Sequence, residues 1–436
     1  MSKQNILTGL ISFIPLSYIL GNFILNLNVV IIILAGFFLY NKGERLKFNI
    51  IDKLMIFAFL YIILTGLWNT TESYFNGYSQ DKDLTIINKS LLFLRYIFLY
   101  FAVRLVTDKE QINYKILFYS FGLSSLFVSI DIIFQFFNGK DLFGFTSPYI
   151  NKLTGPFHTE AIAGGFIQKF SFFLFFGFML LVKVNDIKIK ILILTLLFFV
   201  TLLSIILSGN RMSLILFLFG ISLVFINTKT LRKYILHILV TISLMVLILF
   251  SVNDSVKNYY NGFYQASKNI LSVYSNKLLG SDLDIPYETK HTYLHEFESG
   301  FSTWQLNKYI GGGLKSFRYN CPKRKIESIN VRTTCNIHPH NYYLEILTET
   351  GLVGFVNVSI IFLLILYFTF IKKYLVNSNL KDNHIITPFI FLFIAEIFPL
   401  KSTGSFFTTG NATYIFLLIS ILVALVRLEN SIENKY

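Results

Sequence analysis

Long apolar runs recur along almost the whole 436-residue chain, and they constrain its fold more than any other feature. Most of these runs have roughly 17–25 residues, the length a helix needs to cross about 30 Å of hydrocarbon, and the run over 341–371 is longer than one crossing. Hydrophobic residues make up 54% of the chain and charged residues 14%, with a mean hydropathy of +0.60, more than one soluble core of this length requires. The sequence therefore predicts an all-α polytopic membrane protein without a separate soluble domain.

The runs predict about twelve transmembrane helices. We place them near residues 5–21, 23–40, 51–68, 86–105, 114–137, 161–182, 188–208, 211–228, 232–252, 341–371, 385–402 and 409–428. The first run lacks a small-residue cleavage site, so we expect a retained helix rather than a signal peptide.

The distribution of basic residues predicts the orientation of the chain. The loops NKGERLKFN, KVNDIKIK, NTKTLRK and IKKYLVNSNLK are basic, and a cytoplasmic N-terminus places all of them in the cytoplasm. This topology divides the chain into helices one to nine (1–252), one large outward-facing loop (253–340) and helices ten to twelve (341–436). We expect the loop to face the periplasm, with the protein in the bacterial inner membrane.

The net charge of +14 is spread over short loops. A nucleic-acid partner requires clustered Lys and Arg on one folded face, so we expect none. Positive-inside bias, and attraction to anionic lipid or a phosphorylated substrate, account for the excess.

The two cysteines of the chain, Cys321 and Cys335, both lie in the outward loop. In an oxidising compartment this pattern favours a disulfide over two unpaired thiols. A closed loop of this size stabilises the fold by roughly 3 kcal/mol in the chain-entropy view. The spacing of these cysteines from His338 and His340 matches no usual zinc pattern, and we expect no metal and no cofactor.

Two histidines stand directly before the tenth helix, in CNIHPHNYYLEILTETGLVGF (335–355). His338 precedes Pro339 and should be extended, whereas Asn341 is a good N-cap, so His340 should lie at a helix start on the outer membrane surface. The alternative is a set of interfacial polar residues that merely ends a loop. Two histidines, an asparagine and a preceding segment held by the expected disulfide favour a functional site.

Further residues of the same stretch predict the shape of the helix. Glu345 and Glu349 continue the stripe of Asn341 at a spacing of four. Gly351 and Gly354 permit a kink or a close helix contact as the chain enters the bilayer.

Basic residues on the outward side are candidates for binding an anion. Arg211 opens a helix after the tight turn in LSGNRMSLILFLFG, where it either snorkels to the interface or binds an anion. Lys315 and Arg318 follow the glycine triplet of GGGLKSFRYNCP and would present two cations three residues apart. Guanidinium groups suit phosphate because they bind it with two parallel hydrogen bonds.

Several ionisable or amide side chains fall inside apolar runs, where they are costly and usually line a cavity or pair with each other. They are Arg95, Asp131, Gln135, Lys169 and Glu396. Asp282 and Asp284 form the D-x-D pattern of nucleotide-sugar transferases, a pattern that is common by chance.

Four segments resemble the bacterial O-antigen ligase and polymerase superfamily. His340-Asn341, nine residues, Gly351, two residues and Gly354 are similar to its H-N-x9-G-x2-G signature. LSGNRMSLILFLFG resembles its T-G-S-R helix start, and LTGPFHTEAIAGGFIQKF, which contains Glu160, resembles its G-P-F-x-x-E-x-x-A-G segment. GGGLKSFRYNCP is similar to a glycine-rich approach to the same site.

The resemblance implies a GT-C-like glycosyltransferase that moves a glycan from an undecaprenyl-diphosphate carrier to an acceptor, without metal and with inversion. Membrane lipid surrounds such an enzyme. A histidine with a pKa near neutrality can accept the acceptor's proton, and fixed cations stabilise the diphosphate that leaves. We therefore assign catalysis to His340, Arg211 and Arg318. Substrate binding falls to His338, Asn341, Lys315, Lys169 and Glu160.

The acceptor separates the competing functions. We expect an O-antigen ligase that transfers polysaccharide to lipid A–core, because the chain has one dominant outer loop rather than two comparable basic ones. An O-antigen polymerase and a protein O-oligosaccharyltransferase are the alternatives. A lipid-linked oligosaccharide flippase is a further alternative from another class, but transporters usually show internal repeats and we find none.

Overall fold

We describe the protein from a computed structural model. It describes residues 3–38, 48–75, 80–108, 112–181, 186–227, 232, 235–278, 292–324, 335–375, 385–402 and 404–433. Within these ranges every regular element is helical and no strand occurs. The D-x-D pair Asp282 and Asp284 lies outside the described residues, as do large parts of the basic loops.

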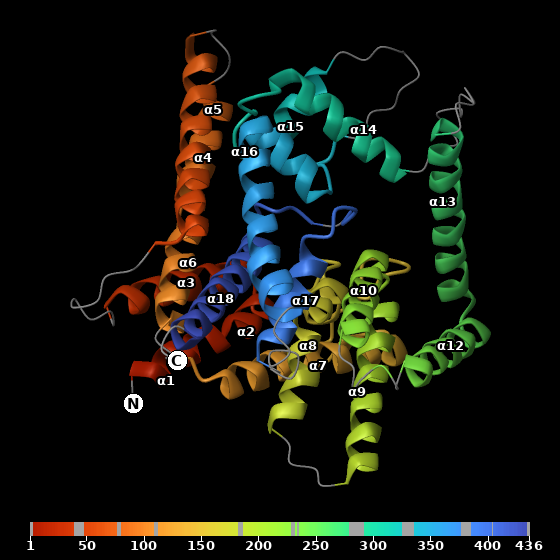
Figure 1. Ribbon diagram of the computed structural model, residues 1–436. Helices are drawn as coiled ribbons and strands as arrows, with labels where there is room; N and C mark the ends of the chain where they lie inside the picture. The colour runs from red at the N-terminus through yellow and green to blue at the C-terminus, as the bar shows by residue number, and fades with distance from the viewer. Residues whose placement is uncertain are drawn as a thin grey trace.

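The helices follow one another along the chain in the order that Figure 1 shows. They are α1 (Lys3–Ser12), α2 (Ile14–Ile19), α3 (Asn22–Phe38), α4 (Ile50–Phe75), α5 (Gln80–Phe93), α6 (Arg95–Asp108), α7 (Tyr114–Asn138), α8 (Ala163–Leu181), α9 (Ile187–Leu207), α10 (Arg211–Asn227), α12 (Ile235–Val252), α13 (Asp254–Leu278), α14 (Thr292–Trp304), α15 (Phe317–Asn320), α16 (Tyr342–Leu366), α17 (Ile386–Glu396) and α18 (Thr409–Glu433). Single turns of 3₁₀-helix lie at Gly155–Phe157, Gln305–Asn307 and Cys321–Lys323, and a π-helical segment, Tyr367–Leu375, continues α16.

Six helices in the described ranges are long and apolar enough to cross a membrane. They cover Ile50–Thr71, Thr85–Asp108, Tyr114–Asn138, Lys188–Leu207, Tyr342–Lys372 and Thr409–Arg427. Shorter apolar helices and one bent helix pair cover most of the remaining predicted runs. The chain is thus an all-helical protein of the multi-pass membrane type, and the count of twelve stays a prediction.

Helix α18 forms the centre of the molecule. It packs against α6, α3 and α17, and other parts of the protein bury most of its apolar residues. The short α17 is also enclosed, since nearly all of its residues are buried. Aromatic side chains fill much of this core, as where Phe118, Phe173 and Phe389 meet edge to face or tilted.

Helices α7 and α8 lie in close contact because a glycine removes a side chain where they meet. A Cβ atom at Gly122 would lie 2.8 Å from the Cα of Leu174, so a larger residue would push the helices apart. Asn113 caps α7 by accepting hydrogen bonds from the amides of Lys115 and Ile116, and Gly139 ends it with a φ of 72°.

Polar residues inside the bundle hold the segment that follows α7. Asp131 accepts a hydrogen bond from the amide of Leu142 at 2.7 Å, and Gln135 accepts one from the amide of Gly155 at 2.9 Å. Arg95 donates to the carbonyl of Leu92 at 2.8 Å. These contacts give the three intramembrane side chains structural partners.

The predicted helix over 385–402 is shorter in the structure. Helix α17 ends at Glu396, and residues 397–408 return as an irregular segment toward the insert (Figure 1). The physical reason lies in Pro399, which cannot donate a helical hydrogen bond, and in Lys401, which turns back to pair with Glu396. The run is apolar enough to predict a helix, but its last residues line the cavity described below.

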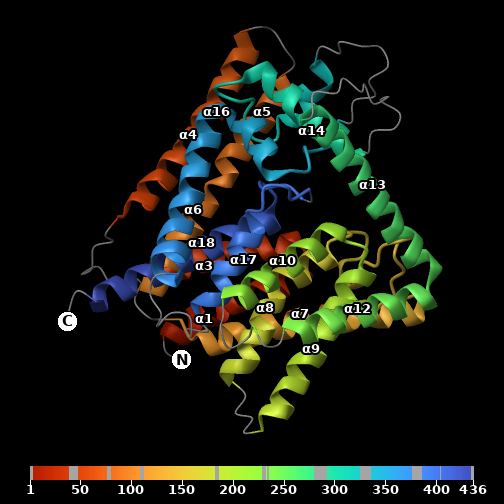
Figure 2. The same cartoon turned by 45° about the vertical axis from the view of Figure 1, so that its right-hand side comes forward.

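The insert after α12 begins with α13 and packs α14 and α15 against α16 (Figure 2). Cys321 and Cys335 form a disulfide with Cα atoms 5.6 Å apart, which ties α15 to the segment before α16. The disulfide therefore cross-links the insert close to the start of α16.

The predicted kink in α16 is confirmed at Gly351, which has φ 64° and ψ −170°. Backbone groups of the insert form hydrogen bonds with the backbone groups of α16 at this break. The amide of Gly313 donates to the carbonyl of Glu349 at 2.8 Å, and the amide of Leu352 donates to the carbonyl of Lys308 at 2.9 Å. The glycine triplet thus docks onto the broken helix.

Candidate functional site

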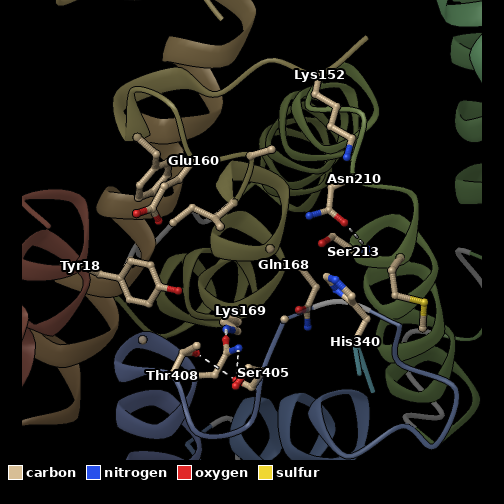
Figure 3. A pocket seen from close by; sticks show the side chains of 18 of the residues that line it. Tyr18, Lys152, Glu160, Gln168, Lys169, Asn210, Ser213, His340, Ser405 and Thr408 are labelled. Carbon is tan, nitrogen blue, oxygen red and sulfur yellow. Dashed lines mark hydrogen bonds between the residues drawn. The ribbon is translucent and has the colours of Figure 1, made fainter. Parts of the chain in front are cut away.

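One cavity of about 840 Å³ opens where α8, α10, the insert and the segment after α17 meet (Figure 3). Its wall is assembled from segments far apart in the sequence. They are residues 18–22, Lys152, 157–162, Gly165, Gln168, Lys169, 209–213, Leu216, Tyr259, Glu296, His338, His340 and parts of 401–411. The volume is that of a typical small-molecule site.

The cavity wall brings most of the predicted site residues together. It includes His340, His338, Arg211, Lys169 and Glu160. Lys315, Arg318 and Asn341 lie outside the described wall.

His340 is held in an uncommon backbone conformation at the cavity. Its φ is 49°, in the left-handed region that non-glycine residues rarely adopt and that is often found at functional sites. Its backbone amide donates a hydrogen bond to Nδ1 of His338 at 3.2 Å. Among the described residues, neither ring nitrogen of His340 has a hydrogen-bond partner. The ring is therefore open to a ligand.

Burial keeps both histidines neutral. It is the largest influence and lowers the pKa of His338 to about 4 and the pKa of His340 below its usual value, while the carboxylate of Glu345 opposes the shift at both. Because Nδ1 of His338 accepts a hydrogen bond, the proton of its neutral ring lies on Nε2. Two uncharged imidazoles thus face the cavity near neutral pH.

The start of α16 fixes this arrangement. As predicted, Asn341 caps the helix, and its side chain accepts hydrogen bonds from the amides of Tyr343 and Leu344, both at 3.0 Å. Its amide group also donates to the carbonyl of Pro399 at 2.8 Å. Asn341 therefore locks the segment after α17 beside His340 instead of facing the cavity.

Arg211 is the first residue of α10 and lies against α13. Its guanidinium stacks 3.8 Å from the centre of the Tyr259 ring and donates to the Tyr259 carbonyl at 2.8 Å. Its Nε is buried without a hydrogen-bond partner in the described part of the chain. The tight turn at Gly209, with φ 65°, brings this arginine to the wall.

Lys152 reaches the cavity from the other side of the same turn (Figure 3). A Cβ atom at Gly209 would lie 2.2 Å from the carbonyl oxygen of Asn151 and 3.2 Å from the Cα of Lys152, so only glycine permits this approach. Its charge is close enough to contribute to the lowered pKa of His340. No residue in the described ranges forms a hydrogen bond or ion pair with its ammonium group, which lies 5.9 Å from the centre of the Tyr149 ring.

The remaining cations of the wall are engaged by protein groups. Lys169 donates to Oδ1 of Asn411. Lys401 pairs with Glu396 at 2.5 Å and donates to the hydroxyl of Tyr342 at 2.9 Å. Burial lowers the pKa of Lys401 to about 8, although Glu396 opposes that shift.

Acidic side chains are few on the wall. Glu160 is exposed at the end of the GPF turn, and Glu296 accepts a hydrogen bond from Asn336 at 3.1 Å. His158, with φ 54°, stacks edge to face on Phe145 at 4.1 Å. The wall carries more cationic than anionic side chains, which suits an anionic ligand.

Lys315 pairs with other protein groups and does not line the cavity. Its ammonium pairs with Glu345 at 3.1 Å and donates to the hydroxyl of Ser405 at 2.6 Å. Arg318 is exposed on α15. Of His340, Arg211 and Arg318, which we expected at one cavity, the first two line its wall and Arg318 does not, although its charge is close enough to contribute to the lowered pKa of His338.

Sequence reasoning missed several wall residues, namely Lys152, His158, Gln168, Asn210 and Lys401. All but Lys401 lie within or next to the motifs already singled out, so motif proximity was the available signal. Lys401 follows an apolar run, and only its polar, glycine-containing neighbourhood hinted at a role. In the described ranges no three His, Cys, Asp or Glu side chains cluster as a metal site would require.

Residues 196–359 match the model of a protein family described as O-antigen ligase. The matched segment contains α10, the insert and the first part of α16, and so includes Arg211, His340 and the kink at Gly351. A search of curated proteins found no match to the chain. The resemblance to the O-antigen ligase and polymerase superfamily is confirmed over these residues.

Proposed function

We propose that this chain, whose residues 196–359 match the O-antigen ligase family, transfers a glycan from undecaprenyl diphosphate to lipid A–core at the periplasmic face of the inner membrane. The family match supports ligase-type or polymerase-type transfer of lipid-linked glycans. The observation that carries the proposal is the meeting of three motif segments, 153–165, 208–211 and 338–341, at one basic cavity that holds His340 and Arg211.

His340 acts as the general base in this proposal. Its ring is neutral because burial lowers its pKa, and its nitrogens have no partner among the described residues. It takes the proton of an acceptor hydroxyl as that oxygen attacks the anomeric carbon. The bond from the anomeric carbon to the phosphate oxygen breaks in the same step, so a direct displacement inverts the configuration.

Arg211 and Lys152 receive the leaving diphosphate. Negative charge grows on the phosphate oxygens as the sugar departs, and two cations from opposite sides of the turn at Gly209 stabilise it. Arg211 is held by Tyr259 and offers a fixed fork, whereas Lys152 offers a point charge on a flexible stem. Arg318 does not line the cavity, so we assign diphosphate binding to Arg211 and Lys152.

His338, Asn341 and Lys315 position the base in this proposal. His338 binds the backbone amide of His340, Asn341 fixes the helix start, and Lys315 holds Glu345 and Ser405 below it. Lys169 and Glu160 lie farther along the wall. We assign them to the acceptor side, where Lys169 orients Asn411.

Lipopolysaccharide from a deletion strain tests the acceptor. Loss of every ladder band, with restoration by the wild-type gene, is expected for a ligase. Core carrying a single repeat unit would instead identify a polymerase, and an unchanged ladder would contradict both. The single large insert supports the ligase.

A further inference from the structure

Gln168 is a buried amide on the cavity wall that the proposed chemistry does not use. It lies in the first turns of α8 and is 2% exposed. Its Nε2 has no hydrogen-bond partner in the part of the chain that the structure describes. Buried amides without a partner are rare in folded proteins, so this one requires an explanation.

Packing does not explain it. Phe172, one turn further along the same face of the helix, is buried and apolar, and an apolar side chain at 168 would leave no unpaired group beside it. The adjacent polar group is satisfied, since Lys169 donates to Asn411. The amide nitrogen of Gln168, in contrast, has no partner among the described residues.

The surroundings of Gln168 point to an uncharged polar ligand. Figure 3 shows its side chain directed into the same space as His340, Asn210 and Ser213. A Cβ atom at Gly165, one turn earlier, would lie 3.6 Å from the hydroxyl of Ser213 and 3.9 Å from the amide nitrogen of Asn210. The wall around Gln168 is therefore built from hydroxyl and amide groups.

We infer that Gln168 binds a hydroxyl or acetamido group of the donor sugar whose anomeric carbon reacts, and so selects the sugar. An amide both donates and accepts a hydrogen bond, as a sugar hydroxyl does, whereas the cations of the wall suit the diphosphate. The inference rests on the proposed function and extends it to a specificity-determining residue. Gln168 has no part in the proton transfer.

The experiment compares Gln168→Leu with the wild-type protein on an undecaprenyl-diphosphate-linked oligosaccharide. We expect kcat/KM for this donor to fall about 10- to 100-fold, the usual effect of losing a hydrogen bond in a buried site. Binding of undecaprenyl diphosphate without a glycan should be unchanged. The thermal midpoint should be equal or higher, because the variant removes an unpaired buried amide.

Ser171→Ala is the matched control. Ser171 lies on the same helix, and its hydroxyl is also buried without a partner among the described residues, but it does not line the cavity. Its kinetics should match the wild type. A donor lacking the bound hydroxyl should lower the wild-type rate by the same factor as Gln168→Leu, and should lower the variant no further.

The outcomes separate the inference from the proposed function. Unchanged kcat/KM in Gln168→Leu, or an equal loss of binding to the glycan-free carrier, would overturn the sugar-binding role while the proposed function stands. A wild-type protein that neither binds undecaprenyl diphosphate nor transfers the glycan would overturn the proposed function, and the inference with it.

Discussion

The backbone amide of His340 donates to Nδ1 of His338 at 3.2 Å, and the centres of the two rings lie 4.2 Å apart. This contact holds His340 at its positive φ, with its ring toward the cavity. Since an accepting Nδ1 requires a neutral ring, protonation of His338 would break the contact. One histidine thus positions the other.

Replacement of His340 by alanine should lower turnover by on the order of 10²- to 10⁴-fold, the usual contribution of a general base, and leave donor binding nearly intact. Turnover and binding are measured with purified protein and a carrier-linked glycan. His237→Ala, on α12 away from this cavity, is the control. If His340→Ala keeps full turnover, the histidine only ends the loop before α16.

The lowered pKa of His338 predicts a pH-dependent stability. Its pKa is about 4 in the folded protein and near 6.5 when unfolded, so between these values the unfolded chain binds more protons. The stability of the folded state is therefore fully present above about pH 6.5 and decreases as the pH falls toward 4. Thermal midpoints from pH 4 to 7 should show this slope, and His338→Gln should reduce it. An equal slope in both proteins would contradict the assignment.

Much of the site could be predicted because its residues act locally. The cap at Asn341 and the break at Gly351 depend on the preferences of single residues, and they agree with expectation. The disulfide needed only two cysteines near each other in the sequence. Where local preference decides the structure, a sequence motif is sufficient.

The remaining features depend on contacts between distant segments. Lys152 joins the cavity because Gly209 lets its loop approach α10, a contact that its position next to the GPF motif does not specify. Arg318 does not line the cavity, and the docking of the glycine triplet on the broken helix, which places this segment, is likewise a contact between distant segments. The run at 385–402 shows the same limit, since Lys401 turns back to Glu396 through a tertiary pairing.

Arg211 and Lys152 should both support donor binding but respond differently to substitution. Arg211→Ala should weaken donor affinity and turnover, and Arg211→Lys should restore them only partly, because lysine lacks the two-pronged geometry. Lys152→Ala should weaken donor affinity, whereas Lys152→Arg should restore most of it. Titration with undecaprenyl diphosphate measures each affinity. Donor affinity unaffected by either alanine would rule out a shared diphosphate site.

Removal of the disulfide should destabilise the insert. Cys321 and Cys335 are 14 positions apart, and a loop of this size implies a loss of about 3 kcal/mol when both are replaced by serine. Thermal unfolding of the double variant is compared with that of the wild type under non-reducing conditions. A reducing agent should lower the wild-type midpoint toward that of the variant. A midpoint insensitive to both changes would show that the cross-link does not stabilise the fold.

Gly351→Ala should damage both stability and activity. Gly351 has φ 64° and ψ −170°, a region that is essentially restricted to glycine and costs roughly 1–3 kcal/mol, and a Cβ atom there would also overlap the backbone of Tyr309 and Gly311. The hydrogen bonds between the insert and the break in α16 would be disturbed, and with them the approach of the chain to His340. Gly9→Ala is the control, because that glycine lies in α1 with nothing within 4 Å of its added Cβ. We expect a lower thermal midpoint and reduced transfer for Gly351→Ala, and wild-type values or a slightly higher midpoint for Gly9→Ala. Equal behaviour of the two variants would mean that the break in α16 is not required for the site.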